Sequence, residues 1–137
     1  MLSGSQQVST VTLSTSFHLS ELSIRPREAI SCFKRALLGS DARETLLNLK
    51  IAGLHDLLEE RAEAAAYHRR CVELGTAEGR PVSEFAKSCM YVARYHLFWG
   101  GGDLKMAREY SEKVAGSNVE ESTVALEYLR KLRTMNH

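Results

Sequence analysis

Apolar side chains recur at helical spacing along residues 45–74, and this stretch sets the pattern for the rest of the chain. A first stripe repeats every three or four residues and stops at the polar run 59–61. A second stripe resumes directly after that run. In chain order the stripes consist of Leu47, Ile51, Leu54 and Leu58, and then Ala64, Tyr67, Cys71 and Leu74. The pattern predicts two amphipathic helices joined by a tight polar turn, which is a helical hairpin.

Small residues lie where the two predicted helices would cross. Ala52 occupies that place in the first helix, and Ala64 and Cys71 occupy it in the second. Two helices approach closely only where the facing side chains are small, so these residues mark the contact line. Their order, with Tyr67 and His68 between the last two, resembles the tetratricopeptide repeat (TPR), a unit of about 34 residues. The resemblance implies an array of helical hairpins that forms a right-handed α-solenoid.

The same helical period continues on both sides of the hairpin and predicts an all-α fold of about six helices. We expect one TPR-like domain over residues 26–137. It would contain a half repeat over 26–39, full repeats over 42–75 and 83–116, and a capping helix over 119–135. The residues that set these boundaries are Pro26, Gly39, Asp41 with Glu44, Gly75, Ser83, Asp103, Gly116, and Asn118 with Glu121.

Superposing the predicted helices shows self-similarity at a repeat period. Residues 29, 33 and 36 match residues 64, 68 and 71 at an offset of 35, and residue 64 matches residue 107 at an offset of 43. In the leading helices, residue 52 matches residue 93. The expected repeat-packing residues are Ala29, Phe33, Ala36, Ala52, Ala64, His68, Cys71, Ala93 and Ala107.

Residues 1–25 differ in composition from the remainder. The first 24 residues hold ten Ser or Thr residues and no Lys or Arg, which predicts a disordered Ser/Thr-rich leader. Such a leader would not cover the helix that follows it. We therefore expect Ile30, Phe33 and Leu37 to be uncovered on one side, and the chain to be able to self-associate through this uncapped end.

Bulk composition narrows the class of protein. The 137 residues are 44% hydrophobic and 26% charged, as in an ordinary globular domain, and the formal net charge is +1. That balance gives no sign of binding to nucleic acid or to an anionic membrane, and no apolar run approaches the roughly 20 residues that span a bilayer. The three cysteines lie inside helical patterns, which favours a reducing compartment, the nucleus or the cytoplasm.

Histidines and cysteines raise the alternative of a small helical metal protein. His68 and Cys71 share one helix face, and His55, Cys89 and His96 fall at comparable places in the pattern. No CxxC or HExxH motif accompanies them, and each one occupies a repeat position that packs against a neighbour. Packing is the favoured interpretation, so we expect no catalytic, cofactor-binding or metal site.

A groove is the better candidate for function, because leading helices line the concave face in this repeat architecture. The solvent side of the two full leading helices carries charged and aromatic side chains that could hold a peptide with an acidic or aromatic group. The alternative is an ordinary solvated helix face. The candidate groove residues are Lys50, Asp56, Lys87, Tyr91 and Arg94.

Longer stretches of the sequence are more specific. EAISCFKRAL, NLKIAGLHDLLEERAEAAAYHRRCVE, AKSCMYVARYHLFWGGGDLKMAREYSEKV and ALEYLRKLR together cover most of residues 26–135. They resemble the C-terminal TPR region of subunit eight of the anaphase-promoting complex, the cell-division-cycle-twenty-three type. The resemblance implies a non-catalytic scaffold of this ubiquitin ligase, which controls mitosis and the cell cycle. Its partners would be other protein subunits or peptide segments. A generic TPR adaptor unrelated to the ligase is the alternative.

Overall fold

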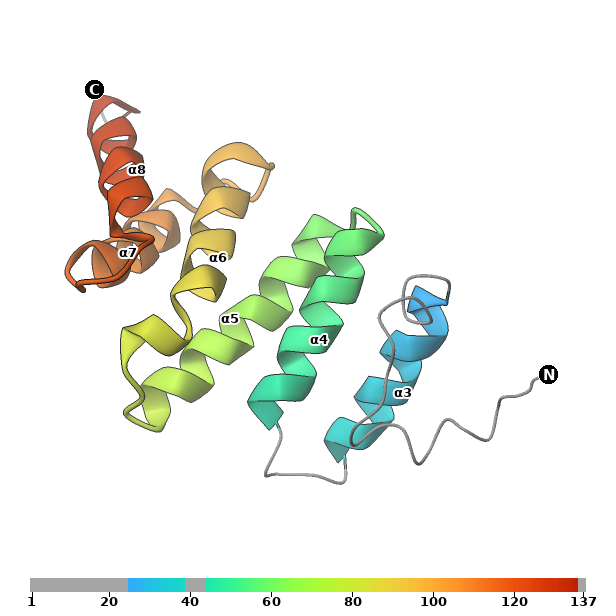
Figure 1. Ribbon diagram of the computed structural model, residues 1–137. Helices are drawn as coiled ribbons and strands as arrows, with labels where there is room; N and C mark the ends of the chain where they lie inside the picture. The colour runs from blue at the N-terminus through green and yellow to red at the C-terminus, as the bar shows by residue number, and fades with distance from the viewer. Residues whose placement is uncertain (1–24, 39–43, 136–137) are drawn as a thin grey trace.

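The computed structural model describes residues 25–38 and 44–135, and within those ranges the chain is helical (Figure 1). The described residues form six α-helices and one short 3₁₀-helix, with no strand among them. In chain order these are α3 (Pro26–Leu38), α4 (Glu44–Leu57), α5 (Arg61–Ala77), η1 (Val82–Glu84), α6 (Ala86–Phe98), α7 (Leu104–Ala115) and α8 (Ser122–Met135). The predicted all-α class is therefore confirmed.

The helices follow one another along one direction, with α3 at one end and α7 and α8 at the other (Figure 1). Each helix packs mainly against its neighbours in the sequence. Buried apolar side chains form separate clusters along the stack, one between α3 and α4 and two more from α5 to α8. This arrangement is consistent with an α-solenoid, in which each unit contacts only its neighbours. In the described ranges, no helix is long and apolar enough to span a bilayer.

Small residues are buried along the helix contacts, as the sequence predicts. Ala52, Ala64 and Ala93 are each 0% exposed, so every atom of these side chains contacts protein. The other predicted repeat-packing residues are also buried or half-buried, namely Ala29, Phe33, Ala36, His68, Cys71 and Ala107. The predicted contact positions therefore face the interior of the stack.

The expectation that α3 leaves its stripe uncovered is wrong for two of the three side chains. Ile30 is 5% exposed and Phe33 is 0% exposed, and both belong to the cluster that joins α3 to α4. Leu37 is half-buried and packs against the same cluster. Self-association through this end stays a prediction, and the predicted leader lies outside the described residues.

The predicted boundaries on either side of η1 are both wrong, and packing explains the first. Gly75 does not end α5, which continues to Ala77. A Cβ atom at residue 75 would lie 2.5 Å from Cδ2 of Phe85, so glycine is needed there for the ring to lie against α5. Ser83 does not cap α6, because Val82–Glu84 forms η1 and α6 has no side-chain cap.

Of the predicted caps of α7 and α8, the first is confirmed and the second is wrong. Asp103 caps α7 as predicted, since its Oδ1 accepts a hydrogen bond from the Met106 backbone N–H at 3.0 Å. The predicted cap of α8 by Asn118 and Glu121 is wrong, because α8 begins only at Ser122. Two further predicted boundary residues lie outside the described ranges, namely Gly39 and Asp41.

Enlarging a crossing residue should destabilise the stack. Ala64→Leu adds three carbon atoms at a position that is 0% exposed, and we expect it to lower the free energy of unfolding by about 1–3 kcal/mol through overpacking. Ala77→Leu, at an exposed position of the same helix, is the matched control and should change little. Urea unfolding followed by circular dichroism measures both. Equal midpoints for the two variants would contradict the close approach proposed for residue 64.

Two glycines within helices should respond oppositely to alanine. Gly53→Ala should stabilise α4 by about 0.5–1 kcal/mol, because a Cβ there meets nothing within 4 Å and alanine is the better helix former. Gly75→Ala should instead cost about 1–3 kcal/mol, because the new methyl group meets the buried Phe85 ring. Thermal unfolding of the two variants tests the difference in sign. A stabilising Gly75→Ala would show that Phe85 is free to move.

Candidate functional site

Three of the predicted groove residues form polar contacts between alternate helices. The Tyr91 hydroxyl on α6 donates a hydrogen bond to Oδ1 of Asp56 on α4, at 2.6 Å. Arg94 Nε, also on α6, donates to the Tyr128 hydroxyl on α8, at 2.8 Å. These bonds place α4, α6 and α8 along one side of the stack. Three of the five predicted groove residues, Asp56, Tyr91 and Arg94, therefore use polar atoms in contacts between helices of this chain.

Tyr91 differs most from the prediction, because it is not a free surface residue. Its side chain is 8% exposed and packs against the His68 and Trp99 rings, with centroid distances of 4.5 and 5.3 Å. Burial, with the hydrogen bond to Asp56 as a second cause, raises the pKa of the Tyr91 phenol. Tyr91 therefore holds the helices together and cannot itself receive a peptide.

The two predicted lysines lie apart from this contact. Lys87 Nζ donates to Oε2 of Glu121 at 2.9 Å, and this ion pair joins α6 to the segment before α8. Lys50 on α4 is half-buried and has no hydrogen-bond or ion-pair partner within the described part of the chain. The structure thus brings Asp56, Tyr91 and Arg94 together, but it does not add Lys50 or Lys87 to them.

Beside Tyr91 lies a group of alternating cations and aromatic rings, which we name the cation–aromatic row. The Arg61 guanidinium lies 4.0 Å from the centroid of Trp99, and the Arg94 guanidinium lies 5.7 Å from the same ring. Arg94 also lies 5.9 Å from the Tyr128 ring, which meets Phe98 edge to face. The row consists of Arg61, Trp99, Arg94, Tyr128, Phe98 and Lys131, from α5, α6, α8 and the residue after α6.

The sequence predicts only one member of this row, Arg94, as a recognition residue. Arg61 lies in the polar run between the two stripes, and the helical pattern assigns Trp99 no role. The signal available was indirect. Consecutive antiparallel helices bring the start of α5 next to the end of α6, so Arg61 and Trp99 meet although they are 38 positions apart.

His68 and Cys71, the candidate metal ligands on α5, make polar contacts to α6 and α4 respectively. His68 Nδ1 lies 2.9 Å from the hydroxyl oxygen of the buried Ser88, and the Cys71 thiol donates to the Thr45 carbonyl at 3.7 Å. Burial lowers the pKa of His68 to about 4 and raises the pKa of Cys71 to about 11. A neutral imidazole beside an un-ionised thiol suits packing better than nucleophilic chemistry.

Metal-binding geometry is not visible in the described residues, where no group of three His, Cys, Asp or Glu side chains is placed to hold an ion. Cys89 is buried, and burial raises the pKa of its thiol to about 12. His55 Nδ1 lies 2.9 Å from Oε1 of Glu60, and Arg27 donates to the other oxygen of that carboxylate. Arg27, and then His55, hold the pKa of Glu60 below its usual value. This contact links α3 to the end of α4.

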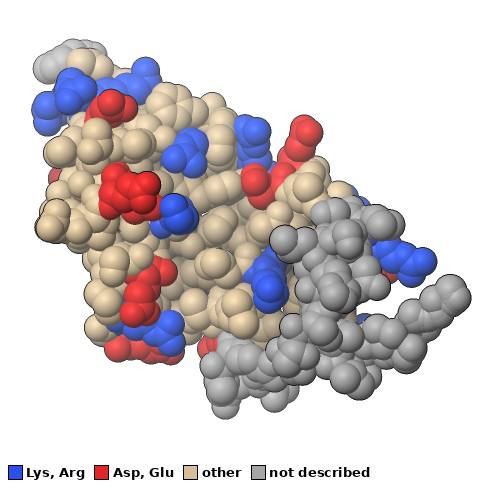
Figure 2. Space-filling model, in the orientation of Figure 1, with Lys and Arg blue, Asp and Glu red and all other residues tan. Residues whose placement is uncertain are grey.

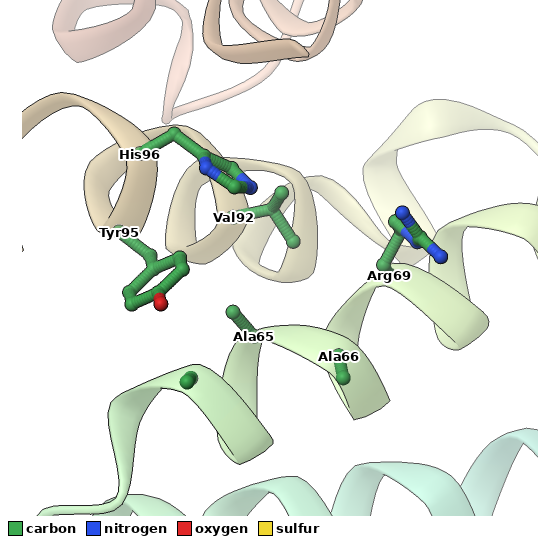
Figure 3. Close-up of a pocket in the computed structure, with 7 residues that line it drawn as sticks. Ala65, Ala66, Arg69, Val92, Tyr95 and His96 are labelled. Atoms are coloured by element: carbon green, nitrogen blue, oxygen red, sulfur yellow. The ribbon is translucent and has the colours of Figure 1, made fainter. Parts of the chain in front are cut away.

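A cavity of about 200 Å³ lies between α5 and α6 (Figure 3). Tyr95 and His96 of α6 face Ala65 and Ala66 of α5 across it, with Arg69 further along α5. Its volume is below the roughly 300–1,000 Å³ of typical small-molecule sites, so it fits one side chain better than a cofactor. The residues that line it are Ala62, Ala65, Ala66, Arg69, Val92, Tyr95 and His96.

Charge on the surface is mixed. On the face in Figure 2, Lys and Arg gather near the end of α8 and elsewhere lie among Asp and Glu. This agrees with the formal net charge of +1 and gives no single large field for a polyanion. In comparisons with known proteins, no family model, no curated protein and no solved structure matches the chain.

The lowered pKa of His68 predicts a dependence of stability on pH. The unfolded chain binds a proton at this residue below about pH 6.5, whereas the folded chain does so only near pH 4. Stability should therefore fall as the pH drops from about 6.5 to about 4, by an amount on the order of 1–3 kcal/mol. His68→Gln cannot take up the proton and should lose this part of the slope. Urea unfolding at several pH values measures it, and an unchanged slope in the variant would contradict the burial effect.

Proposed function

We propose that this chain is a non-catalytic, TPR-like scaffold that binds segments of other proteins in the nucleus or the cytoplasm. The observation that carries the proposal is the separation of two kinds of residue. Small, His and Cys side chains at the repeat positions are buried between successive helices, as with Ala64 and Cys71. Charged and aromatic side chains from different helices collect on the outside, as with Arg61 and Trp99. The buried residues at the repeat positions stabilise the stack, and the outer charged and aromatic residues are available to bind a partner.

The chemistry of the buried groups supports the non-catalytic part of this proposal. A catalytic thiol needs a lowered pKa and access to a substrate, and Cys71 and Cys89 have raised pKa values and no exposed surface. His68, which would be the base in a Cys–His pair, has its pKa lowered to about 4 by burial. These residues are therefore better suited to holding α5 against its neighbours than to turnover.

The finer proposal is a place in the anaphase-promoting complex, and with it in ubiquitin conjugation and mitotic control. It depends on the sequence resemblance, in particular on EAISCFKRAL, on the IAGLHDLLEE segment and on the final ALEYLRKLR. The order of helices is compatible with a TPR array, and the right-handed superhelix of such arrays is part of the proposal. A generic TPR adaptor would have the same helices without the ligase partners.

Co-purification separates the ligase scaffold from the generic adaptor. The full chain with an affinity tag should recover other subunits of the anaphase-promoting complex from a dividing-cell lysate in fixed proportions. An unrelated TPR protein with the same tag is the control for adhesive binding. Recovery of those subunits at the level of the control would contradict the place in the ligase and leave the adaptor. Metal analysis tests the third class, because stoichiometric zinc that is lost in a His68→Ala, Cys71→Ala variant would favour a metal protein.

A further inference from the structure

The cation–aromatic row offers a recognition surface of defined chemistry. Arg61 is the first residue of α5, and Trp99 directly follows α6, so the centre of the row lies where the ends of two antiparallel helices meet. The Arg61 side chain is exposed, whereas Trp99 and Arg94 are half-buried. The row is therefore open to solvent on one side and anchored in the protein on the other.

The centre of the row is held in place before any partner arrives. Trp99 meets the Tyr91 ring edge to face at a centroid distance of 5.3 Å, and the Tyr91 hydroxyl is fixed by Asp56. Arg94 is oriented by its own hydrogen bond to Tyr128. Side chains that are already ordered lose little conformational entropy on binding, so a ligand would meet a prepared surface.

The two guanidinium groups at the centre lack an acid partner. Among the described residues, neither Arg61 nor Arg94 forms an ion pair, a feature that they share with most other Lys and Arg side chains there and not with Arg27, Arg69, Arg80 and Lys87. Glu63 on the same helix is two residues from Arg61 and so lies about 200° around α5 from it. Asp56 is the nearby carboxylate; its Oδ1 accepts a hydrogen bond from the Tyr91 hydroxyl, and it forms no ion pair with either arginine.

Stacking on an indole leaves a guanidinium able to bind an anion. The Arg61 guanidinium lies over the Trp99 ring at 4.0 Å from its centroid, and a guanidinium in a stacked contact keeps edge N–H donors that suit a carboxylate in a bidentate contact. Further along the row, Phe98 is 48% exposed and has Lys131 over its ring. The surface therefore alternates sites for acidic groups with sites for apolar groups.

We propose that the cation–aromatic row binds an extended acidic segment of a partner protein, in which carboxylates alternate with apolar side chains. The carboxylates contact Arg61 and Arg94, and the apolar side chains lie on Trp99 and Phe98. This inference rests on the proposed function as a protein-binding scaffold and assigns it a ligand class. Nucleic acid is disfavoured, because the chain as a whole carries a net charge of only +1.

Trp99 is the only tryptophan of the chain, so its fluorescence reports directly on the row. The probe is a short capped peptide that alternates glutamate with leucine, and its counterpart carries glutamine in place of each glutamate. We expect the acidic peptide to change the Trp99 emission and to bind about tenfold or more tightly than the counterpart, as expected for charge-assisted hydrogen bonds. Rhodamine-labelled peptide and fluorescence anisotropy give the affinities.

Charge reversal at Arg61 tests the contact, with a matched control elsewhere. Arg61→Glu should weaken binding of the acidic peptide about tenfold, and it should still fold because an acid suits the first turn of a helix. Lys105→Glu makes the same charge change at an exposed position in the first turn of α7 and should change the affinity less than about twofold. Circular dichroism checks that both variants are folded.

Several results would overturn the proposal. These are failure of the acidic peptide to bind, equal losses in the Arg61 and Lys105 variants, and tighter binding of a single-stranded oligonucleotide than of the peptide. The outcome is independent of the co-purification experiment. Ligase subunits that co-purify with the wild-type chain, when the acidic peptide does not bind that same chain, would reject the row and keep the scaffold. If the acidic peptide binds in a way that depends on Arg61 but no ligase subunits co-purify with the chain, the row is kept and the place in the ligase is rejected.

Discussion

Close approach of neighbouring helices is the constraint on which this structure depends. Each helix packs mainly on the ones before and after it in the sequence, so no central core compensates for a poor contact. Ala52, Ala64 and Ala93 have no exposed surface, and any larger side chain there would push two helices apart. Gly75 also allows a close contact, because it has no Cβ atom and so leaves room for the ring of Phe85. Small residues at the crossings thus let the helices approach, and the larger apolar side chains of the buried clusters pack between them.

Polar contacts add a second level of order to this packing. Tyr91 bonds to Asp56, and Arg94 bonds to Tyr128, so α6 is fixed to both α4 and α8, which are its neighbours but one. Buried hydrogen bonds contribute modestly to net stability, but a shifted helix would leave their donors unpaired at a larger cost. They therefore select one register of the helices. The same two side chains orient Trp99, and in this way the geometry of the surface follows from the geometry of the stack.

The sequence predicted the helices well, because apolar period and punctuation by Pro26 and Asp103 are local signals. The prediction that Gly75 ends a helix was wrong. A glycine near the end of an apolar stripe usually marks a helix end, and the sequence does not show that the Phe85 ring, ten residues further on, packs against residue 75. Tyr91 was likewise predicted to be a surface residue. Helical spacing gives the angle of a side chain around its own helix, but burial depends on which further helices lie on that side. Tyr91 is covered by residues from α5 and by Trp99, and that arrangement is a property of the fold.

The His and Cys residues show why composition alone is a poor guide to chemistry in such a stack. His68 and Cys71 share a helix face, which is the spacing that a metal site or a nucleophile would use, but that face is also the one that α5 turns toward its neighbours. Burial there keeps the imidazole neutral and the thiol protonated, and Ser88 and Thr45 form hydrogen bonds with His68 Nδ1 and the Cys71 thiol. Recognition is then left to the side chains that packing does not use. Arg61 is such a residue, because it begins α5 at the exposed edge, has an aromatic ring beneath it and forms no ion pair among the described residues.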